Sequence, residues 1–388
     1  MLSVLAFLGA SIWLIILILP WRPWSTREQL EADPKDAGED LQDITVLIPA
    51  RNEETEIGET LHALQTQGEG LKVVVVNDQS ADRTAEKARK AYDPQLISIV
   101  DGKPLESGWA GKLWALEQGR LTIQSEFILL HDADIKLAPG ILKSLKAKMQ
   151  KENLGFISLM AALRMENFWE KLLIPAYIYF FKLLFPFHLS NSANRHFASA
   201  AGGCILVRRK ILEEIGGFAA LRDAFIDDCT LAALVKSYGH RSWTGMTHSV
   251  TSHRAYEKLT EIWNLVARFA FTYLRYSSVL LILCSLILVA AFWALPAALI
   301  FKTNADTASK LYWTCGLASM VGVYLPTLRF YKLSPFWTLL KPIAGTLYLL
   351  MTWSSALRYW RGQRTEWKGR VYNQRLENDA PIKDQSAA

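Results

Sequence analysis

Apolar segments at both ends of the chain constrain its fold more than any other sequence feature. Residues 2–21 contain no charged side chain, and about 20 such residues can span a bilayer as a helix. The stretches 279–301 and 311–328 are similarly apolar, and a third stretch, 335–357, is interrupted by Lys341. The sequence therefore predicts one soluble domain between membrane segments.

The first apolar segment is predicted to be an uncleaved anchor over residues 1–24. A cleavable signal peptide has a basic start and a small-residue cleavage site, and the segment shows neither. Trp21 and Trp24 are typical of a membrane interface. Arg22 and Arg27 follow the apolar segment at once, which favours a cytoplasmic position for this end. We therefore expect the next domain to face the cytoplasm.

Residues 276–357 are predicted to form C-terminal membrane helices. Three full crossings would place the tail outside, against the tendency of basic residues to stay cytoplasmic, so one segment is expected to be re-entrant or interfacial. The tail, 358–388, is basic and is expected to be cytoplasmic or interfacial. Its clustered cations are Arg358, Arg361, Arg364, Lys368, Arg370 and Arg375. They suit anionic lipid headgroups and phosphates, or plain solvation. No nucleic-acid-binding motif accompanies the net charge of +6, so a nucleic-acid partner is not expected.

Strand-like and helical patterns alternate between the apolar ends. Residues 25–43 are acidic and are predicted to be a linker, after which the runs ITVLIP, KVVVVN, LISIV and EFILLH predict buried strands. Helical stretches are expected at 55–67, 81–91, 111–122 and 139–151. The alternation predicts an α/β domain over 44–275, with a mostly parallel sheet covered on both faces. Ligands of such sheets bind beyond the carboxyl ends of the strands.

Residues 168–188 are rich in aromatic side chains but are too short to span a membrane. Lys171 and Lys182 confine the uncharged run to about ten residues. An interfacial helix is the prediction, and a buried core helix is the alternative.

Polar motifs follow the strand-like runs in sequence order. PARNEE (49–54) leaves the first strand, NDQSADRT (77–84) follows the second, HDAD (131–134) follows the fourth, and IDDCTL (226–231) comes much later. Each motif alone is a weak signal, because short acidic motifs also cap helices and form turns. Their order along successive strands indicates one common site.

Carboxylates dominate these motifs and indicate a divalent cation. Asp132 and Asp134 lie in one loop where both can face one ion, and such oxygen ligands suit Mg²⁺ or Mn²⁺. Asp78, at a neighbouring strand end, is placed for a ribose hydroxyl or a base edge. Asp227 or Asp228 is available as a general base, or it simply begins a helix.

In combination, PARNE, NDQSADRT, GWAGK, DAD, AAGGC…GGF and IDDCTLA resemble the family 2 glycosyltransferases with the GT-A fold over residues 44–275. Three longer stretches resemble the hopene-associated glycosyltransferases of bacterial hopanoid gene clusters. These are GWAGKLWALEQG (108–119), FWEKLLIPAYIYFFKLLFPF (168–187) and AAGGCILVRRKILEEIGGF (200–218). The resemblance implies a GT-A type nucleotide-sugar-binding domain, joined to N-terminal and C-terminal transmembrane helices.

This resemblance also implies a reaction: inverting transfer from a nucleotide-diphosphate sugar, with a UDP-sugar expected, to a lipid acceptor such as a hopanoid or another isoprenoid lipid. Asp132 and Asp134 would bind Mg²⁺ or Mn²⁺, which neutralises the departing diphosphate, and Asp228 would be the base. The implied donor-binding positions are Pro49, Ala50, Arg51, Glu53, Asp78, Lys112, Asp132 and Gly203. Lys112 is equally consistent with a helix-surface lysine, and Gly203 with ordinary packing.

One family motif is incomplete. Many relatives carry Gln-x-x-Arg-Trp near the acceptor side, whereas the nearest strings here are LVARF (265–269) and TYLRY (272–276). Arg268 is the candidate for stabilising the leaving phosphate, with Arg275 left open. The missing Gln and Trp weaken an inference of polymer synthesis. Residues 366–370 resemble a tail motif of members with lipid acceptors and are expected near the membrane face of the site.

The expected location is the bacterial inner (cytoplasmic) membrane, with the catalytic domain facing the cytoplasm. The nearest alternative is a transferase that charges polyprenyl phosphate with one sugar, whose anionic acceptor would meet the basic residues 358–370. A synthase-like translocator would need more spanning helices and the complete motif. A non-catalytic scaffold that binds nucleotide sugar would normally have lost carboxylates that are all present here.

Overall fold

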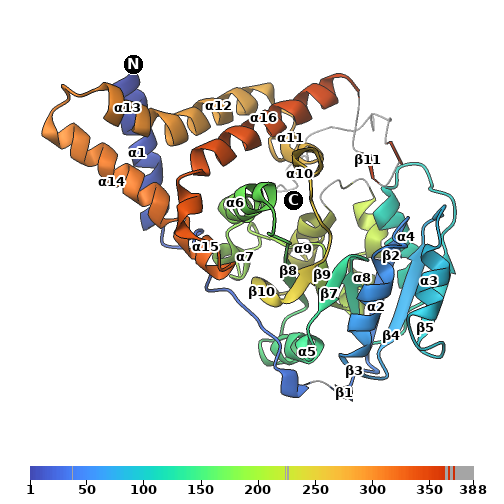
Figure 1. The fold of residues 1–388 in the computed structure, drawn as a ribbon. Helices are drawn as coiled ribbons and strands as arrows, with labels where there is room; N and C mark the ends of the chain where they lie inside the picture. Colours follow the sequence, from blue (N-terminus) through green and yellow to red (C-terminus); the bar gives the residue numbers. More distant parts are fainter. Residues whose placement is uncertain (37, 223, 225–226, 363–365, 368–369, 372–388) are drawn as a thin grey trace, which may run out of the picture.

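The computed structural model describes the chain except for residues 37, 223, 225–226, 363–365, 368–369 and 372–388. Its centre is a sheet that has eight strands in the described part of the chain, with helices on both faces (Figure 1). In spatial order the strands are β5 (Ile97–Asp101), β4 (Lys72–Asn77), β2 (Ile44–Ala50), β6 (Phe127–His131), β9 (Cys204–Arg208), β8 (Phe156–Ala162), β10 (Ser242–Ser252) and β7 (Ile135–Leu137).

Most strand pairs in this sheet are parallel. Parallel pairing joins β5, β4, β2 and β6 in succession and also joins β8 to β10, whereas β9 is antiparallel to β6 and β8, and β7 to β10. The four predicted strands are β2, β4, β5 and β6. The predicted helices form α2 (Ile57–Gln65), α3 (Thr84–Lys90), α4 (Gly111–Arg120) and α5 (Ile141–Lys151). The predicted α/β fold class is therefore confirmed.

Two apolar clusters cover the two faces of the sheet. In β2, Val46 and Ile48 belong to one cluster and Leu47 to the other, because successive side chains of a strand point to opposite faces. Leu61 of α2 joins the first cluster, and Leu116 of α4 joins the second. The second face is also covered by α8 (Arg209–Glu214) and α9 (Asp227–Ser237). The polar residues that follow the strands are consequently left at the carboxyl edge of the sheet.

Two helical stretches among the described residues are long and apolar enough to cross a membrane, by length and composition. An 18-residue window within Ser278–Phe301 has a mean hydropathy of 2.7, and one within Thr307–Phe330 has a mean hydropathy of 1.2. The first stretch comprises α12 (Ser278–Val289), a π-helical turn η3 (Ala290–Ala294) and α13 (Leu295–Phe301), and the second comprises α14 (Thr307–Gly322) and α15 (Leu325–Phe330). The N-terminal helix α1 (Leu2–Ile18) is apolar but shorter.

Helix α1 packs directly against both of these stretches (Figure 1). The indole nitrogen of Trp13 donates a hydrogen bond to the carbonyl of Ala291, in the π-helical turn, at 2.6 Å. A Cβ atom on Gly316 would lie 2.6 Å from Cα of Ala10, so this glycine permits the close approach of α14 and α1. The predicted anchor is thus one member of a packed group of helices.

The stretch 335–357, left open by the sequence, forms η4 (Pro335–Thr338) and most of α16 (Lys341–Trp360). The indole of Trp353 donates to Ser285 of α12 at 3.0 Å, and the hydroxyl of Tyr348 donates to the carbonyl of Leu173 at 2.9 Å. Leu173 belongs to α6 (Phe168–Leu184), and α16 also contacts α10 (Leu259–Ala267) and α11 (Ala270–Tyr273). Helix α16 therefore joins α12 to the helices above the sheet. Helix α6 is largely buried, and its interfacial position stays a prediction.

The remaining elements are short. They are η1 (Pro34–Asp36), β1 (Glu39–Asp40), β3 (Gly68–Glu69), α7 (Phe187–Ser190), η2 (Gly217–Leu221), β11 (Glu366–Trp367) and β12 (Arg370–Val371). In the predicted linker, Glu31 accepts hydrogen bonds from Ser249 and from the backbone of His248. The domain boundaries stay predictions, and most of the tail 358–388 lies outside the described residues.

Candidate active site

The first two motifs meet at the carboxyl ends of neighbouring parallel strands. Pro49 and Ala50 end β2, where they pair in register with Val76 and Asn77 of β4. The backbone N–H of Asp78 donates to the carbonyl of Ala50 at 2.8 Å. Asp78 is completely buried. The strand pairing therefore brings the predicted donor-binding positions of both motifs together.

Side chains also tie these two loops to one another. The Nη1 of Arg51 donates to the carbonyl oxygens of Asp78 at 2.6 Å and Gln79 at 3.2 Å. The backbone N–H of Glu53 donates to the hydroxyl of Thr84 at 2.8 Å. Arg51 thus fixes the loop after β4 by binding the carbonyl oxygens of Asp78 and Gln79. The backbone of Glu53 is held beside that loop by Thr84.

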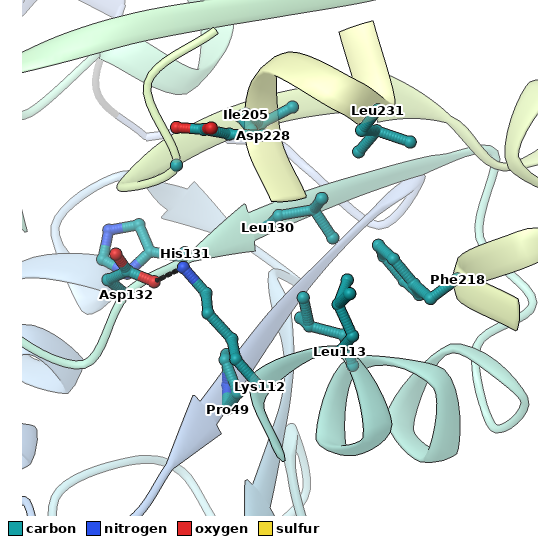
Figure 2. Close-up of a pocket in the computed structure, with 12 residues that line it drawn as sticks. Pro49, Lys112, Leu113, Leu130, His131, Asp132, Ile205, Phe218, Asp228 and Leu231 are labelled. Atoms are coloured by element: carbon teal, nitrogen blue, oxygen red, sulfur yellow. Dashed lines mark ion pairs between the residues drawn. The ribbon is translucent and has the colours of Figure 1, made fainter. Parts of the chain in front are cut away.

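Lys112 connects the first turn of α4 to the third motif. Its Nζ lies 2.7 Å from Oδ1 of Asp132, and Figure 2 shows its side chain rising from α4 to that carboxylate, with Asp228 across the pocket. A Cβ atom on Gly202 would lie 3.4 Å from Lys112 Nζ and 3.5 Å from Asp228 Oδ2. The glycine therefore leaves space where an ammonium group and two carboxylates converge.

The pocket at this edge combines these charged groups with an apolar floor. Its polar and small lining residues are Pro49, Lys112, His131, Asp132, Gly202 and Asp228. Its apolar lining residues are Leu113, Leu116, Leu130, Ile205, Phe218 and Leu231 (Figure 2). Burial lowers the pKa of His131 to about 4, although Asp132 opposes this effect, so the imidazole is neutral at pH 7.

Asp134 pairs with a cation that the sequence motifs did not identify. The Nε of Arg254 lies 2.7 Å from Asp134 Oδ2, and Nη2 lies 3.2 Å from Glu53 Oε1. Burial raises the pKa of Asp134, and Asp132 adds to this effect while Arg254 opposes it. The carboxylates of Asp132 and Asp134 are therefore close enough to repel one another.

The carboxylates of Asp132 and Asp134 fit a divalent cation whose remaining ligands come partly from the substrate. Among the described residues, no group of three or more His, Cys, Asp or Glu side chains is arranged to hold a metal ion. Mg²⁺ is usually bound through one or two carboxylates and substrate phosphates rather than by a cage of protein ligands. Asp132 and Asp134 supply such a carboxylate pair, and a bound cation would relieve their repulsion.

Tyr177 and Arg268 lie within electrostatic range of one another and of the Asp228 region. Burial raises the pKa of Tyr177, on α6, and the neighbouring carboxylate of Asp228 adds to the shift, whereas Arg268 opposes it. Arg268 directly follows α10, with its guanidinium 4.4 Å from the ring centre of Phe269. Asp227 begins α9, and its side chain lies outside the described part of the structure.

The structure thus gathers most of the predicted site residues at one edge. Gly203 lies behind the pocket, where its carbonyl accepts from the N–H of Asp132 at 3.2 Å, and its neighbour Gly202 faces the charged groups. Sequence reasoning missed Arg254 and Tyr177. Arg254 follows β10, so the rule about strand ends would have found it if that strand had been predicted.

Comparisons with known proteins show the family and the fold of the chain. The family model for glycosyl transferase family 21 matches residues 73–380. The 4,4'-diaponeurosporenoate glycosyltransferase of Staphylococcus haemolyticus is 35% identical over 121 residues, which cover 31% of this chain and 32% of that protein. The enzyme of the same name from Staphylococcus aureus (strain bovine RF122) is 37% identical over 112 residues, covering 29% of this chain and 28% of that protein. The chain spans about a third of the length of these curated relatives.

A solved structure with the same fold is a mannosyltransferase from Pyrobaculum calidifontis, determined with GDP-Man and Mn²⁺. It superposes with a TM-score of 0.56 at 18% identity, covering 92% of this chain and 99% of that chain. This likeness extends to the curled, mostly parallel sheet and its helices, and the GT-A type fold is therefore shown. Since the family model covers well over half of the sequence, the chain belongs to glycosyl transferase family 21.

Proposed function

We propose that the protein is a membrane-bound, inverting glycosyltransferase that moves a sugar from a nucleotide-diphosphate donor to a lipid. A UDP-sugar is the proposed donor, and a hopanoid or another isoprenoid lipid is the proposed acceptor. The observation that carries the proposal is the ion pair of Lys112 with Asp132 at the strand ends, with Asp228 across the same pocket. A proposed metal ligand (Asp132), a cation for phosphate (Lys112) and a candidate base (Asp228) line one pocket.

Asp132 and Asp134 would hold Mg²⁺ or Mn²⁺, and a bound cation neutralises charge on a departing diphosphate. Lys112, which lines the pocket together with Asp228, and Arg268 are proposed to add positive charge. Phosphate oxygens accept strong charge-assisted hydrogen bonds from such groups. Their role is to hold the diphosphate in place and to stabilise it as the bond from the sugar C1 to the phosphate oxygen breaks.

Asp228 is the proposed general base. It takes the proton of the acceptor hydroxyl as the oxygen bonds to the sugar C1, on the face opposite the leaving diphosphate. This attack inverts the configuration at C1. Asp228 lies in the first turn of α9, where the helix dipole favours its ionised, proton-accepting form.

A lipid acceptor is supported by the apolar surface and by the relatives. Large side chains of α12 are exposed, among them Val279 (75%), Ile282 (54%) and Leu286 (59%), and an apolar surface of this kind suits a bilayer. The relatives are named for glycosylation of 4,4'-diaponeurosporenoate, a carotenoid-type lipid. We place the protein in the bacterial inner membrane, with its catalytic domain on the cytoplasmic side marked by Arg22 and Arg27.

Radiolabelled nucleotide sugars, screened on purified protein in detergent with Mg²⁺ or Mn²⁺, test this proposal. The acceptor is a total lipid extract that contains hopanoids and polyprenyl phosphates. A labelled, base-stable hopanoid supports the proposed acceptor and identifies the sugar. An acid-labile product that migrates as a polyprenyl phosphate sugar moves the assignment to the polyprenyl-phosphate transferase. Nucleotide binding without transfer to any lipid contradicts the catalytic proposal and favours a scaffold.

A further inference from the structure

Arg254 joins two carboxylates that belong to different donor loops. Its guanidinium contacts Asp134, in the loop after β6, and both carboxylate oxygens of Glu53, in the loop after β2, at distances of 2.7, 3.2 and 3.3 Å. The side chains of Asp134 and Glu53 are only 16% and 10% exposed. Arg254 therefore bridges two largely buried carboxylates.

The backbone on each side fixes this contact. Ser252 of β10 pairs with Ile135 of β7, and the N–H of His253 donates to the carbonyl of Asp134 at 3.1 Å. The sheet itself consequently places Arg254 beside Asp134. Glu53 is held independently by Thr84. The contact thus connects three anchored segments and is not an incidental surface ion pair, which would contribute little.

Charge gives Arg254 opposite effects on two ligands. A divalent cation at Asp132 and Asp134 would lie near the guanidinium, and like charges repel, the more so where solvent is partly excluded. A nucleoside diphosphate carries negative charge and is attracted by the same group. A bound diphosphate would balance both positive charges.

We propose that Arg254 is a positioning residue that makes divalent-cation binding depend on the donor. It holds the Glu53 and Asp134 loops together, weakens cation binding in the empty site and strengthens binding of the diphosphate. The inference rests on the proposed function, because it concerns the metal and donor of that site.

Binding measurements on the purified full chain test the inference without activity. Mn²⁺ binding is followed by electron paramagnetic resonance, alone and with saturating UDP, with GDP in parallel. In Arg254→Met, Mn²⁺ affinity without nucleotide is expected to rise about threefold or more, while nucleotide affinity in the presence of Mn²⁺ falls about tenfold or more. Arg254→Lys keeps the charge and is expected to lie between the wild type and Arg254→Met.

Two further variants serve as controls. Arg83→Met removes a cation whose side chain is 68% exposed and which pairs with Glu54 at the same edge, and it should change neither affinity. Asp134→Ala should lower Mn²⁺ affinity, and unchanged Mn²⁺ binding by this variant would contradict the metal assignment.

The possible failures are distinguishable. Suppose that the wild type binds Mn²⁺ and nucleotide, and that both Arg254 variants fold but bind Mn²⁺ equally well or more weakly. This result overturns the inference and leaves the proposed function standing, because a purely structural role of Arg254 would lower the affinities for both Mn²⁺ and nucleotide. A wild-type protein that binds neither Mn²⁺ nor nucleotide overturns the inference together with the proposed function.

Discussion

The ammonium nitrogen of Lys112 lies 2.7 Å from Oδ1 of Asp132, so the first turn of α4 is joined to the end of β6. The lysine side chain is only 24% exposed, and it is oriented toward the space that it shares with Asp228 and Gly202. A lysine that merely solvated a helix surface would extend into water. The ion pair therefore favours the donor-phosphate role of Lys112 over the helix-surface alternative that its sequence context left open.

Replacing Lys112 with Met should weaken donor binding by about 10-fold to 100-fold, because a charge-assisted contact to phosphate is lost. The KM for the nucleotide sugar should rise, and Lys112→Arg should restore part of the loss. Lys90→Met is the matched control, since Lys90 is exposed and forms an ion pair with its helix neighbour Glu86. An unchanged KM in Lys112→Met would remove Lys112 from the donor site.

Glu170 is expected to be a main stabilising residue of the segment that carries Arg254. It is fully buried and accepts hydrogen bonds from the backbone N–H groups of Glu166, Asn167 and Tyr256 at 2.8, 3.2 and 2.9 Å. Glu170→Ala leaves these donors unsatisfied and should lower the free energy of unfolding by about 3 kcal/mol. Glu170→Gln keeps one acceptor oxygen and should lose about half as much, as measured by thermal unfolding in detergent.

The same residue gives a pH dependence. Burial acts to raise the pKa of Glu170, but the three N–H donors and Arg164 outweigh burial and hold the pKa below its ordinary value. A carboxyl group whose pKa is lowered by folding stabilises the protein fully at a pH above the pKa that it has in the unfolded chain. This stabilisation is lost as the pH falls through the pKa that the group has in the folded protein. The stability difference between the wild type and Glu170→Gln should therefore shrink on acidification below about pH 4.5. A difference that grows there would contradict this account.

Gly316 permits the close packing of α14 against α1, and a large side chain there should separate the two helices. Gly316→Leu would place atoms within 2.6 Å of Ala10, and overpacking of this kind costs about 2 kcal/mol. Gly322 lies on the same helix with nothing within 4 Å of its Cβ direction, so Gly322→Leu is the matched control. Thermal unfolding in detergent should show a lower transition for Gly316→Leu only; equal transitions would mean that α1 does not pack here.

The donor side of the site could be predicted because its residues follow strands with strong apolar patterns. Pro49, Asp78 and Asp132 each come at or directly after such a strand, and parallel strand ends meet at one edge of a sheet. Arg254 could not be found this way. It follows β10, whose sequence SWTGMTHSVTS shows no apolar run although the strand is largely buried. Several of its hydroxyls are hydrogen-bonded there, such as that of Thr244 to the carbonyl of Ser199 at 2.6 Å.

The packing of the C-terminal helices could be predicted only in outline, because it also depends on a buried polar residue. The sequence treats Lys341 as an interruption, because a charged residue does not favour an apolar span. In the structure Lys341 begins α16 and is buried, with Nζ 4.2 Å from the ring centre of Trp13, 4.0 Å from that of Tyr179 and 4.7 Å from that of Tyr324. Trp13 and Tyr179 lie on α1 and α6, and Tyr324 lies in the turn between α14 and α15. Cation–π contacts between such separate segments have no signature in the sequence. The proximity of Tyr177 to Asp228 likewise depends on how α6 packs.

Transfer by Asp228→Asn, compared with the wild type in a single-turnover reaction, tests the central claim most directly. Labelled nucleotide sugar and the acceptor lipid found in the donor screen are mixed with each protein, and donor binding is measured in parallel. Loss of a general base should slow transfer by about 10²-fold to 10⁴-fold while donor affinity changes little, and Asp227→Asn should remain active. Wild-type transfer by Asp228→Asn would contradict the account, and loss of transfer only in Asp227→Asn would move the base to Asp227.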